Sequence, residues 1–117
     1  RMAKPVLYHN PRCSKSRETL ALLEARGVDL DVVKYLEEPL SAAEVIDLAK
    51  KLGPDASRLV RTKEAAYAES GLTRESSVEE IAAAIAKAPV LLERPILVVG
   101  EKAAIGRPPS DVLKLLD

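Results

Sequence analysis

Cysteine is almost absent from this chain, because Cys13 is the single cysteine among 117 residues. One cysteine excludes an internal disulfide and any metal site built from several thiolates. It also limits redox chemistry, since one thiol cannot close a catalytic disulfide by itself. If Cys13 carries out thiol chemistry, the second thiol must come from another molecule.

An excess of charge and long apolar runs are also missing. Lys and Arg together number 18, as do Asp and Glu, so the net charge is zero. Non-specific binding to nucleic acid or acidic membranes needs a basic excess, which this composition excludes. The longest apolar runs, 81–86 and 95–100, are far shorter than the roughly 20 residues of a membrane span. With no secretory signal pattern in view, we expect one cytoplasmic domain over residues 2–117, present as a monomer.

The first third of the chain has the pattern of a strand, a helix and a second strand. Residues 6–9 form a short apolar and aromatic run that ends at an Asn-Pro turn. Good helix formers follow from Ser14 to Arg26, and Gly27 supplies a stop. Residues 31–36 are again rich in β-favouring side chains and predict the second strand.

Two helix starts in the middle of the chain carry capping boxes. Ser41 precedes Glu44 by three residues, and Ser77 precedes Glu80 by three. In both segments apolar residues then recur at the spacing of one helical face. The stretch 57–71 between them is less regular and predicts one or two short helices.

The last third predicts a hairpin and a final helix. Residues 96–99 are all apolar and favour a central strand, and a turn at 100–102 leads into a second strand at 103–105. Two prolines at 108 and 109 then open a helix, where proline is tolerated in the first turn. The complete order is similar to the thioredoxin/glutaredoxin plan. We therefore expect an α/β fold with a mixed sheet (β-α-β … β-β-α) and a helical insertion at about 40–90.

Cys13 lies between a turn and a predicted helix start. Free N–H groups and the helix dipole at such positions favour negative charge, and they lower a thiol pKa from about 8.5 to roughly 3.5–7.5. Arg12, Lys15 and Arg17 add positive charge nearby, and His9 can do so as well. A lone cysteine is more commonly a small buried apolar residue, but the polar neighbours here favour a reactive thiol.

The residues around Cys13 have open roles at this point. His9 either acts electrostatically on the thiol or hydrogen bonds within the turn. Asn10 is better explained as a turn-forming residue than as a catalyst. Ser16 either hydrogen bonds the thiolate or caps the helix, and Arg17 either helps to hold an anion or lies on the solvated helix face.

Residues 9–19 read His-Asn-Pro-Arg-Cys-Ser-Lys-Ser-Arg-Glu-Thr. This run resembles the H-N-P-x-C-x-x-S-R-x-T signature of the glutaredoxin-coupled arsenate reductase family. The likeness continues, in order and over nearly the whole chain, through residues 35–36, 39, 61–64, 93–96 and 106–109.

The resemblance implies a set of site residues. Cys13 takes the position of the nucleophile, and Arg61, Arg94 and Arg107 lie in the motifs that contain the family's three essential arginines. Pro95 takes the position where thioredoxin-like folds place a cis-proline beside the cysteine. Guanidinium groups bind tetrahedral oxyanions bidentately, which suits arsenate. No metal and no bound organic cofactor are implied.

The implied activity is reduction of arsenate to arsenite through a covalent intermediate on Cys13, with glutathione as co-substrate and a glutaredoxin as partner. One alternative is a housekeeping monothiol oxidoreductase that acts on glutathione or protein disulfides. Another is a non-enzymatic regulator of the Spx type, which binds RNA polymerase and senses oxidation through two cysteines. Ser16 stands where that second cysteine would be, so the sensing disulfide is excluded.

Overall fold

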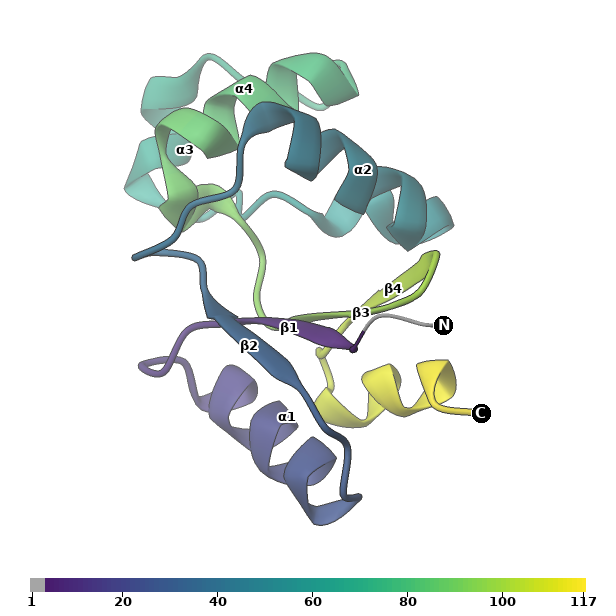
Figure 1. Ribbon diagram of the computed structural model, residues 1–117. Helices are drawn as coiled ribbons and strands as arrows, with labels where there is room; N and C mark the ends of the chain where they lie inside the picture. The colour runs from purple at the N-terminus through teal and green to yellow at the C-terminus, as the bar shows by residue number, and fades with distance from the viewer. Residues whose placement is uncertain (1–3) are drawn as a thin grey trace.

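A four-stranded mixed sheet in the order β2-β1-β3-β4 lies at the centre of the protein (Figure 1). The computed structural model describes residues 4–117, so residues 2 and 3 of the predicted domain lie outside the described part. β1 pairs in parallel with β2 and antiparallel with β3, and β3 pairs antiparallel with β4. The predicted mixed sheet and its central third strand are therefore confirmed. The bounds are β1 Val6–His9, β2 Asp31–Lys34, β3 Ile96–Val99 and β4 Lys102–Ile105.

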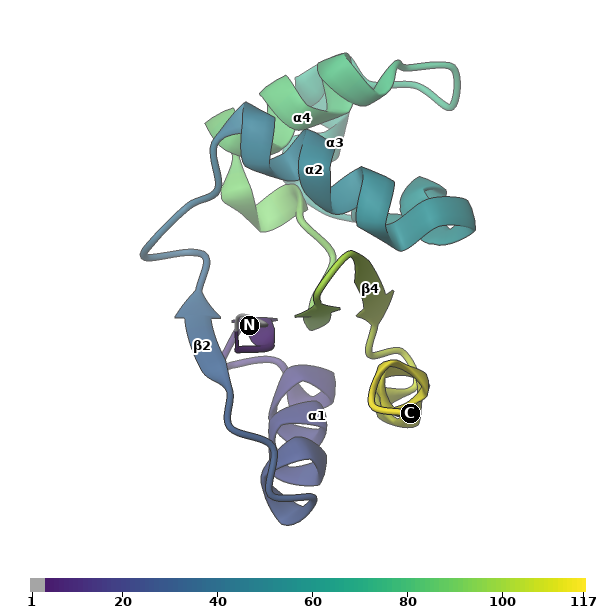
Figure 2. The same cartoon turned by 45° about the vertical axis from the view of Figure 1, so that its right-hand side comes forward.

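Helices cover the sheet on both faces, as Figures 1 and 2 show. α1 (Ser14–Ala25) and η3 (Pro109–Leu115) lie on one side. The helices between β2 and β3 lie on the other side; these are α2 (Ala42–Leu52), η1 (Gly53–Arg58), α3 (Ala65–Ser70), α4 (Val78–Lys87) and η2 (Pro89–Leu91). Within residues 4–117 there is no helix with the length and apolar character needed to cross a membrane.

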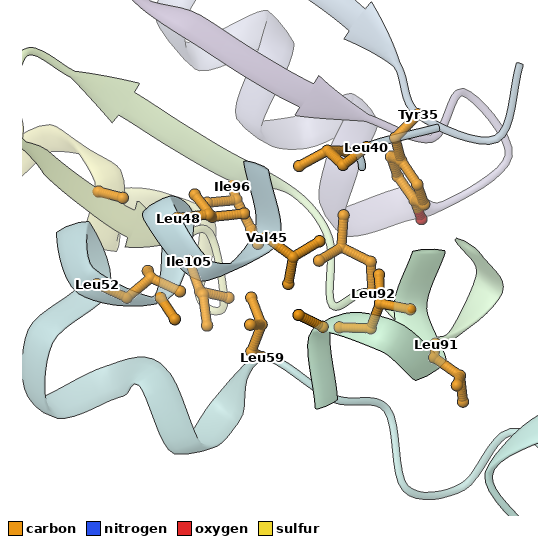
Figure 3. Close-up of a cluster of buried hydrophobic side chains, with 14 residues drawn as sticks. Tyr35, Leu40, Val45, Leu48, Leu52, Leu59, Leu91, Leu92, Ile96 and Ile105 are labelled. Carbon is orange, nitrogen blue, oxygen red and sulfur yellow. The ribbon is translucent and has the colours of Figure 1, made fainter. Parts of the chain in front are cut away.

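Successive side chains of β3 point to opposite faces of the sheet and enter two different hydrophobic cores. Ile96 is fully buried in the larger core under the inserted helices, together with Ile105 (Figure 3). The next residue, Leu97, points to the opposite face and packs with Leu7 and Leu23 in the smaller core above α1. Complete burial of a side chain of this size contributes about 1.5–3 kcal/mol. The central strand therefore joins both layers of helices.

Both predicted capping boxes are present. The Ser41 hydroxyl accepts from the Glu44 N–H at 3.1 Å, and the Glu44 carboxylate accepts from the Ser41 N–H at 2.9 Å. The pair at Ser77 and Glu80 has the same two bonds, at 3.1 and 2.8 Å. Each box satisfies backbone donors that the first helical turn leaves unpaired.

The second strand is shorter than predicted. It ends at Lys34 rather than at residue 36, because its partner β1 ends opposite, at His9. The chain then turns, and the N–H groups of Glu37 and Glu38 both donate to the Lys34 carbonyl at 2.9 Å.

The final helix also differs in detail, because η3 is a 3₁₀-helix throughout. The Asp111 N–H donates to the Pro108 carbonyl and the Leu116 N–H to the Leu113 carbonyl, both at 3.0 Å. These tight turns leave Val112 fully buried against the smaller core.

Candidate active site

The turn after β1 places Cys13 at the N-cap of α1. The Asn10 side-chain oxygen accepts from the Arg12 N–H, and the Asn10 carbonyl accepts from the Cys13 N–H, both at 3.0 Å. Arg17 is exposed and donates from Nη1 to the Pro11 carbonyl at 3.0 Å. Asn10 thus stabilises the turn with two hydrogen bonds, and the Arg17 guanidinium hydrogen bonds the Pro11 carbonyl on its exposed side.

His9 and Ser16 meet beneath this turn. His9 Nδ1 and Ser16 Oγ lie 2.6 Å apart in a hydrogen bond, and Oγ also accepts from the Asn10 N–H at 3.0 Å. Burial lowers the pKa of His9, and the positive charges of Lys34 and Arg17 lower it further. A neutral imidazole bonded to Ser16 connects β1 to α1. The Ser16 hydroxyl is used in this contact, whereas its backbone N–H lowers the pKa of the Cys13 thiol.

The hairpin places two of the three arginines beside the thiol. Ile96 pairs with Ile105 across the hairpin, so Arg94 and Arg107 emerge at the same end of the sheet. Arg107 Nη2 donates to Cys13 Sγ at 3.3 Å, and Arg107 Nε donates to the Arg94 carbonyl at 2.8 Å. The peptide bond from Arg94 to Pro95 is cis, as is the bond from Arg107 to Pro108, which the sequence did not suggest.

Arg61 reaches the same place from the inserted helices. Val60 and Leu92 form an isolated antiparallel bridge, flanked by hydrogen bonds of 2.8 Å from the Arg61 N–H to Leu91 and from the Glu93 N–H to Leu59. This pairing brings the segment around Arg61 next to the segment that leads into β3. The sequence alone could not place Arg61.

Two carboxylates that sequence reasoning did not assign hold the three arginines together. Glu93 Oε1 accepts hydrogen bonds from Arg61 Nη1 at 2.6 Å and from the Arg94 N–H at 3.1 Å, and it forms an ion pair with Arg107 Nε at 3.1 Å. Glu64 Oε2 accepts from Arg61 Nε at 3.0 Å and lies 3.8 Å from Arg94 Nη1. The only sequence signal was that both glutamates lie within the arginine motifs.

Opposing influences set the pKa of the Cys13 thiol, and the outcome is a pKa below its ordinary value. Burial raises it, because a thiolate is poorly solvated in the protein. The nearby Ser16 N–H, the Arg94 side chain and the charges of Arg107 and Arg94 lower it by more. The site therefore favours a thiolate, which is the nucleophilic form.

Gly106 lets α1 and the proline turn approach one another closely. A Cβ at this position would lie 2.6 Å from Thr19 Oγ1 and 2.7 Å from Pro95 Cγ. The Gly106 N–H also donates to the Pro95 carbonyl at 2.9 Å. Only glycine fits this junction without movement, and the junction fixes the start of the segment that carries Arg107.

A cavity of about 300 Å³ lies beside the arginines and is lined by Val60, Arg61, Thr62, Lys63, Glu93 and Arg107. Arg107 connects it to the thiol, because the same guanidinium donates to Cys13 Sγ. Within residues 4–117, no group of three or more His, Cys, Asp or Glu side chains is arranged to hold a metal ion. The arrangement can hold an anion next to a nucleophilic sulfur.

Known proteins match this chain over almost its full length. The model of the ArsC family matches residues 8–115. The arsenate reductase of Haemophilus influenzae is 46% identical over 113 residues, covering 95% of this chain and 97% of the relative. The uncharacterized protein YfgD of Escherichia coli K12 is 52% identical over 118 residues, covering 98% and 99%. Among solved structures, an arsenate reductase from Vibrio cholerae superposes with a TM-score of 0.90 at 44% identity, over 98% of this chain and 99% of that one.

Proposed function

The chain belongs to the ArsC family, and on that premise we propose that it reduces arsenate to arsenite, with Cys13 as nucleophile and glutathione as reductant. The observation that carries this proposal is the 3.3 Å contact between Arg107 Nη2 and Cys13 Sγ, next to a cavity lined by cationic side chains. Relatives named arsenate reductases support the choice of substrate.

The arginines bind the substrate. Guanidinium groups donate paired hydrogen bonds to tetrahedral oxyanions, and Arg61 and Arg107 line the cavity. The Arg94 side chain lies near the Cys13 thiol and lowers its pKa. Together these cations offset the repulsion between an anionic substrate and the thiolate, and they stabilise charge on the departing oxygen.

In the first step the Cys13 thiolate attacks pentavalent arsenic. A sulfur–arsenic bond forms, one arsenic–oxygen bond breaks, and the oxygen leaves as hydroxide or, after taking up a proton, as water. The product is a covalent thiol–arsenate adduct in which arsenic is still pentavalent.

In the second step the glutathione thiolate attacks Cys13 Sγ. A disulfide forms between Cys13 and glutathione as the sulfur–arsenic bond breaks. The electron pair of that bond stays on arsenic, which leaves as trivalent arsenite. An external thiol is required here because the chain has one cysteine.

A glutaredoxin then restores the free thiol. Its thiolate attacks the glutathione sulfur of the mixed disulfide and releases Cys13 by thiol–disulfide exchange. The proposal places the reaction in the cytoplasm, where glutathione keeps thiols reduced.

The test is a coupled assay that follows NADPH consumption with arsenate, glutathione, glutaredoxin and glutathione reductase. We expect arsenate-dependent turnover by the wild type and its loss in Cys13→Ser, with an unchanged circular dichroism spectrum. Substantial activity in the variant would contradict the assignment of the nucleophile. Absence of turnover in the wild type, with Cys13 still rapidly glutathionylated, would favour a general monothiol oxidoreductase.

A further inference from the structure

Glu93 is an acidic side chain in a cavity that is otherwise suited to anions. We propose that its carboxylate determines specificity by selecting oxyanions that carry a proton, such as monohydrogen arsenate or phosphate, over fully ionised oxyanions such as sulfate. This inference rests on the proposed function, in which the arginine-lined cavity binds the oxyanion.

The hydrogen bonds of Glu93 are unevenly distributed between its two oxygens. Oε1 accepts hydrogen bonds from Arg61 and from the Arg94 backbone, and it forms an ion pair with Arg107. Oε2 accepts no hydrogen bond and makes no ion pair among residues 4–117. The side chain is 19% exposed and lines the cavity. One carboxylate oxygen thus positions the arginines, and the other is left for a ligand.

An ionised carboxylate can only accept hydrogen bonds. Monohydrogen arsenate and monohydrogen phosphate have an O–H at neutral pH that can donate to Oε2. Sulfate has no such proton, so one of its negative oxygens would face the carboxylate oxygen without a hydrogen between them. Sites built to hydrogen bond a ligand hydroxyl strongly reject analogues that lack it, because a buried polar group is then left unpaired.

The cations cannot supply this discrimination. Arg61, Lys63 and Arg107 line the same cavity, but they attract phosphate and sulfate dianions by the same charge. Among residues 4–117, Glu93 is the one acidic side chain that lines it. Glu93 is therefore the residue that distinguishes a protonated from an unprotonated oxyanion.

Glu64 offers a matched control. Its carboxylate also pairs with Arg61 and lies near Arg94, but it does not line the cavity. Glu64→Gln and Glu93→Gln remove the same charge from the same cluster. The charge affects both anions alike, so the informative quantity is the ratio of the two affinities.

The experiment measures protection of Cys13 from alkylation by iodoacetamide in the presence of inorganic phosphate or sulfate, neither of which is reduced. In the wild type we expect phosphate to protect at a lower concentration than sulfate. In Glu93→Gln this preference falls by about tenfold or more, and in Glu64→Gln it stays at the wild-type value. If Glu93→Gln changes protection by both anions equally, so that the ratio of the two affinities is unchanged, Glu93 only positions the arginines.

A second probe requires no variant and so does not depend on the folding of Glu93→Gln. Monofluorophosphate has the charge of monohydrogen phosphate, but a fluorine replaces the hydroxyl. We expect it to protect the wild type as weakly as sulfate does, and protection equal to that of phosphate would overturn the inference. Protection by none of the three anions would contradict the anion site of the proposed function itself, a result distinct from equal protection by all three.

Discussion

The reactivity of Cys13 depends on a few donors around one sulfur atom. The Ser16 N–H comes from the same helical turn, whereas Arg94 and Arg107 come from the far end of the chain. His9 is bonded to Ser16 and its pKa is lowered, so it supports the turn rather than adding a positive charge beside the thiolate. The arginines are therefore the cations that stabilise the thiolate.

Arg107→Ala should raise the pKa of the Cys13 thiol. Because the thiolate is the reactive form, the alkylation rate falls as the pH decreases through the thiol pKa. The midpoint of that profile should lie below that of an ordinary thiol in the wild type and move to higher pH in the variant, with a several-fold slower reaction at neutral pH. The measurement is the rate of iodoacetamide alkylation as a function of pH.

Arg26→Ala is the control for this prediction. It removes the same charge from an exposed residue at the C-terminal end of α1, far along the helix from the thiol, and it should leave the profile unchanged. Equal midpoints in the wild type and Arg107→Ala would show that Arg107 does not stabilise the thiolate.

The junctions between elements hold the site together as much as the elements themselves. α1 approaches the turn before β3 at Gly106, where Thr19 and Pro95 leave no room for a Cβ. The residue that follows, Arg107, bonds the thiol. A change at this contact should therefore affect both stability and the chemistry of Cys13.

Gly106→Ala should lower the free energy of unfolding by about 1–3 kcal/mol, through overpacking. It should also slow Cys13 alkylation at neutral pH, because the added methyl group displaces the segment that carries Arg107. The measurements are urea unfolding and the alkylation rate.

Gly27→Ala separates the two effects. Gly27 has a positive φ of 70° and no atom within 4 Å of a Cβ, so the substitution should cost about 1–2 kcal/mol by backbone strain alone. Its alkylation rate should stay at the wild-type value. If Gly106→Ala destabilises the protein but leaves the Cys13 alkylation rate at the wild-type value, as Gly27→Ala should, the junction has no role at the site.

The molecule as a whole consists of two helical layers joined by one sheet. Because Ile96 and Leu97 are adjacent on β3 and face different cores, both helical layers pack against this strand. The inserted helices therefore have no hydrophobic core that is independent of the sheet. We expect the described chain to unfold as one cooperative unit.

Ile96→Ala and Leu97→Ala should each lower the free energy of unfolding by about 2–5 kcal/mol. All three tyrosines, Tyr8, Tyr35 and Tyr67, belong to the larger core or pack against it. Tyrosine fluorescence thus reports the larger core between the sheet and the inserted helices, and far-ultraviolet circular dichroism reports all helices. Their urea transitions should coincide in the wild type and in both variants.

Val32→Ala serves as the reference, since its side chain is exposed on the edge strand and the change should stay within about 0.5 kcal/mol. Loss of the fluorescence signal at lower urea than the dichroism signal would mean that the inserted helices unfold separately.

The sequence by itself determined what depends on near neighbours along the chain. The capping boxes at Ser41 and Ser77 form because their partners are three residues away, and Cys13 lies at a helix start because the turn before it is local. The hairpin likewise places Arg94 and Arg107 at one end of the sheet through a short connection.

Only the tertiary structure decided the features that depend on distant segments. β2 ends at Lys34 because β1 ends opposite it, which the composition of β2 does not reveal. Arg61 and Glu93 are 32 positions apart and meet through the bridge between Val60 and Leu92. A charge pair of this kind follows from packing between distant segments, so no local pattern could have paired Glu93 with Arg61, whereas Glu64 lies only three residues from Arg61.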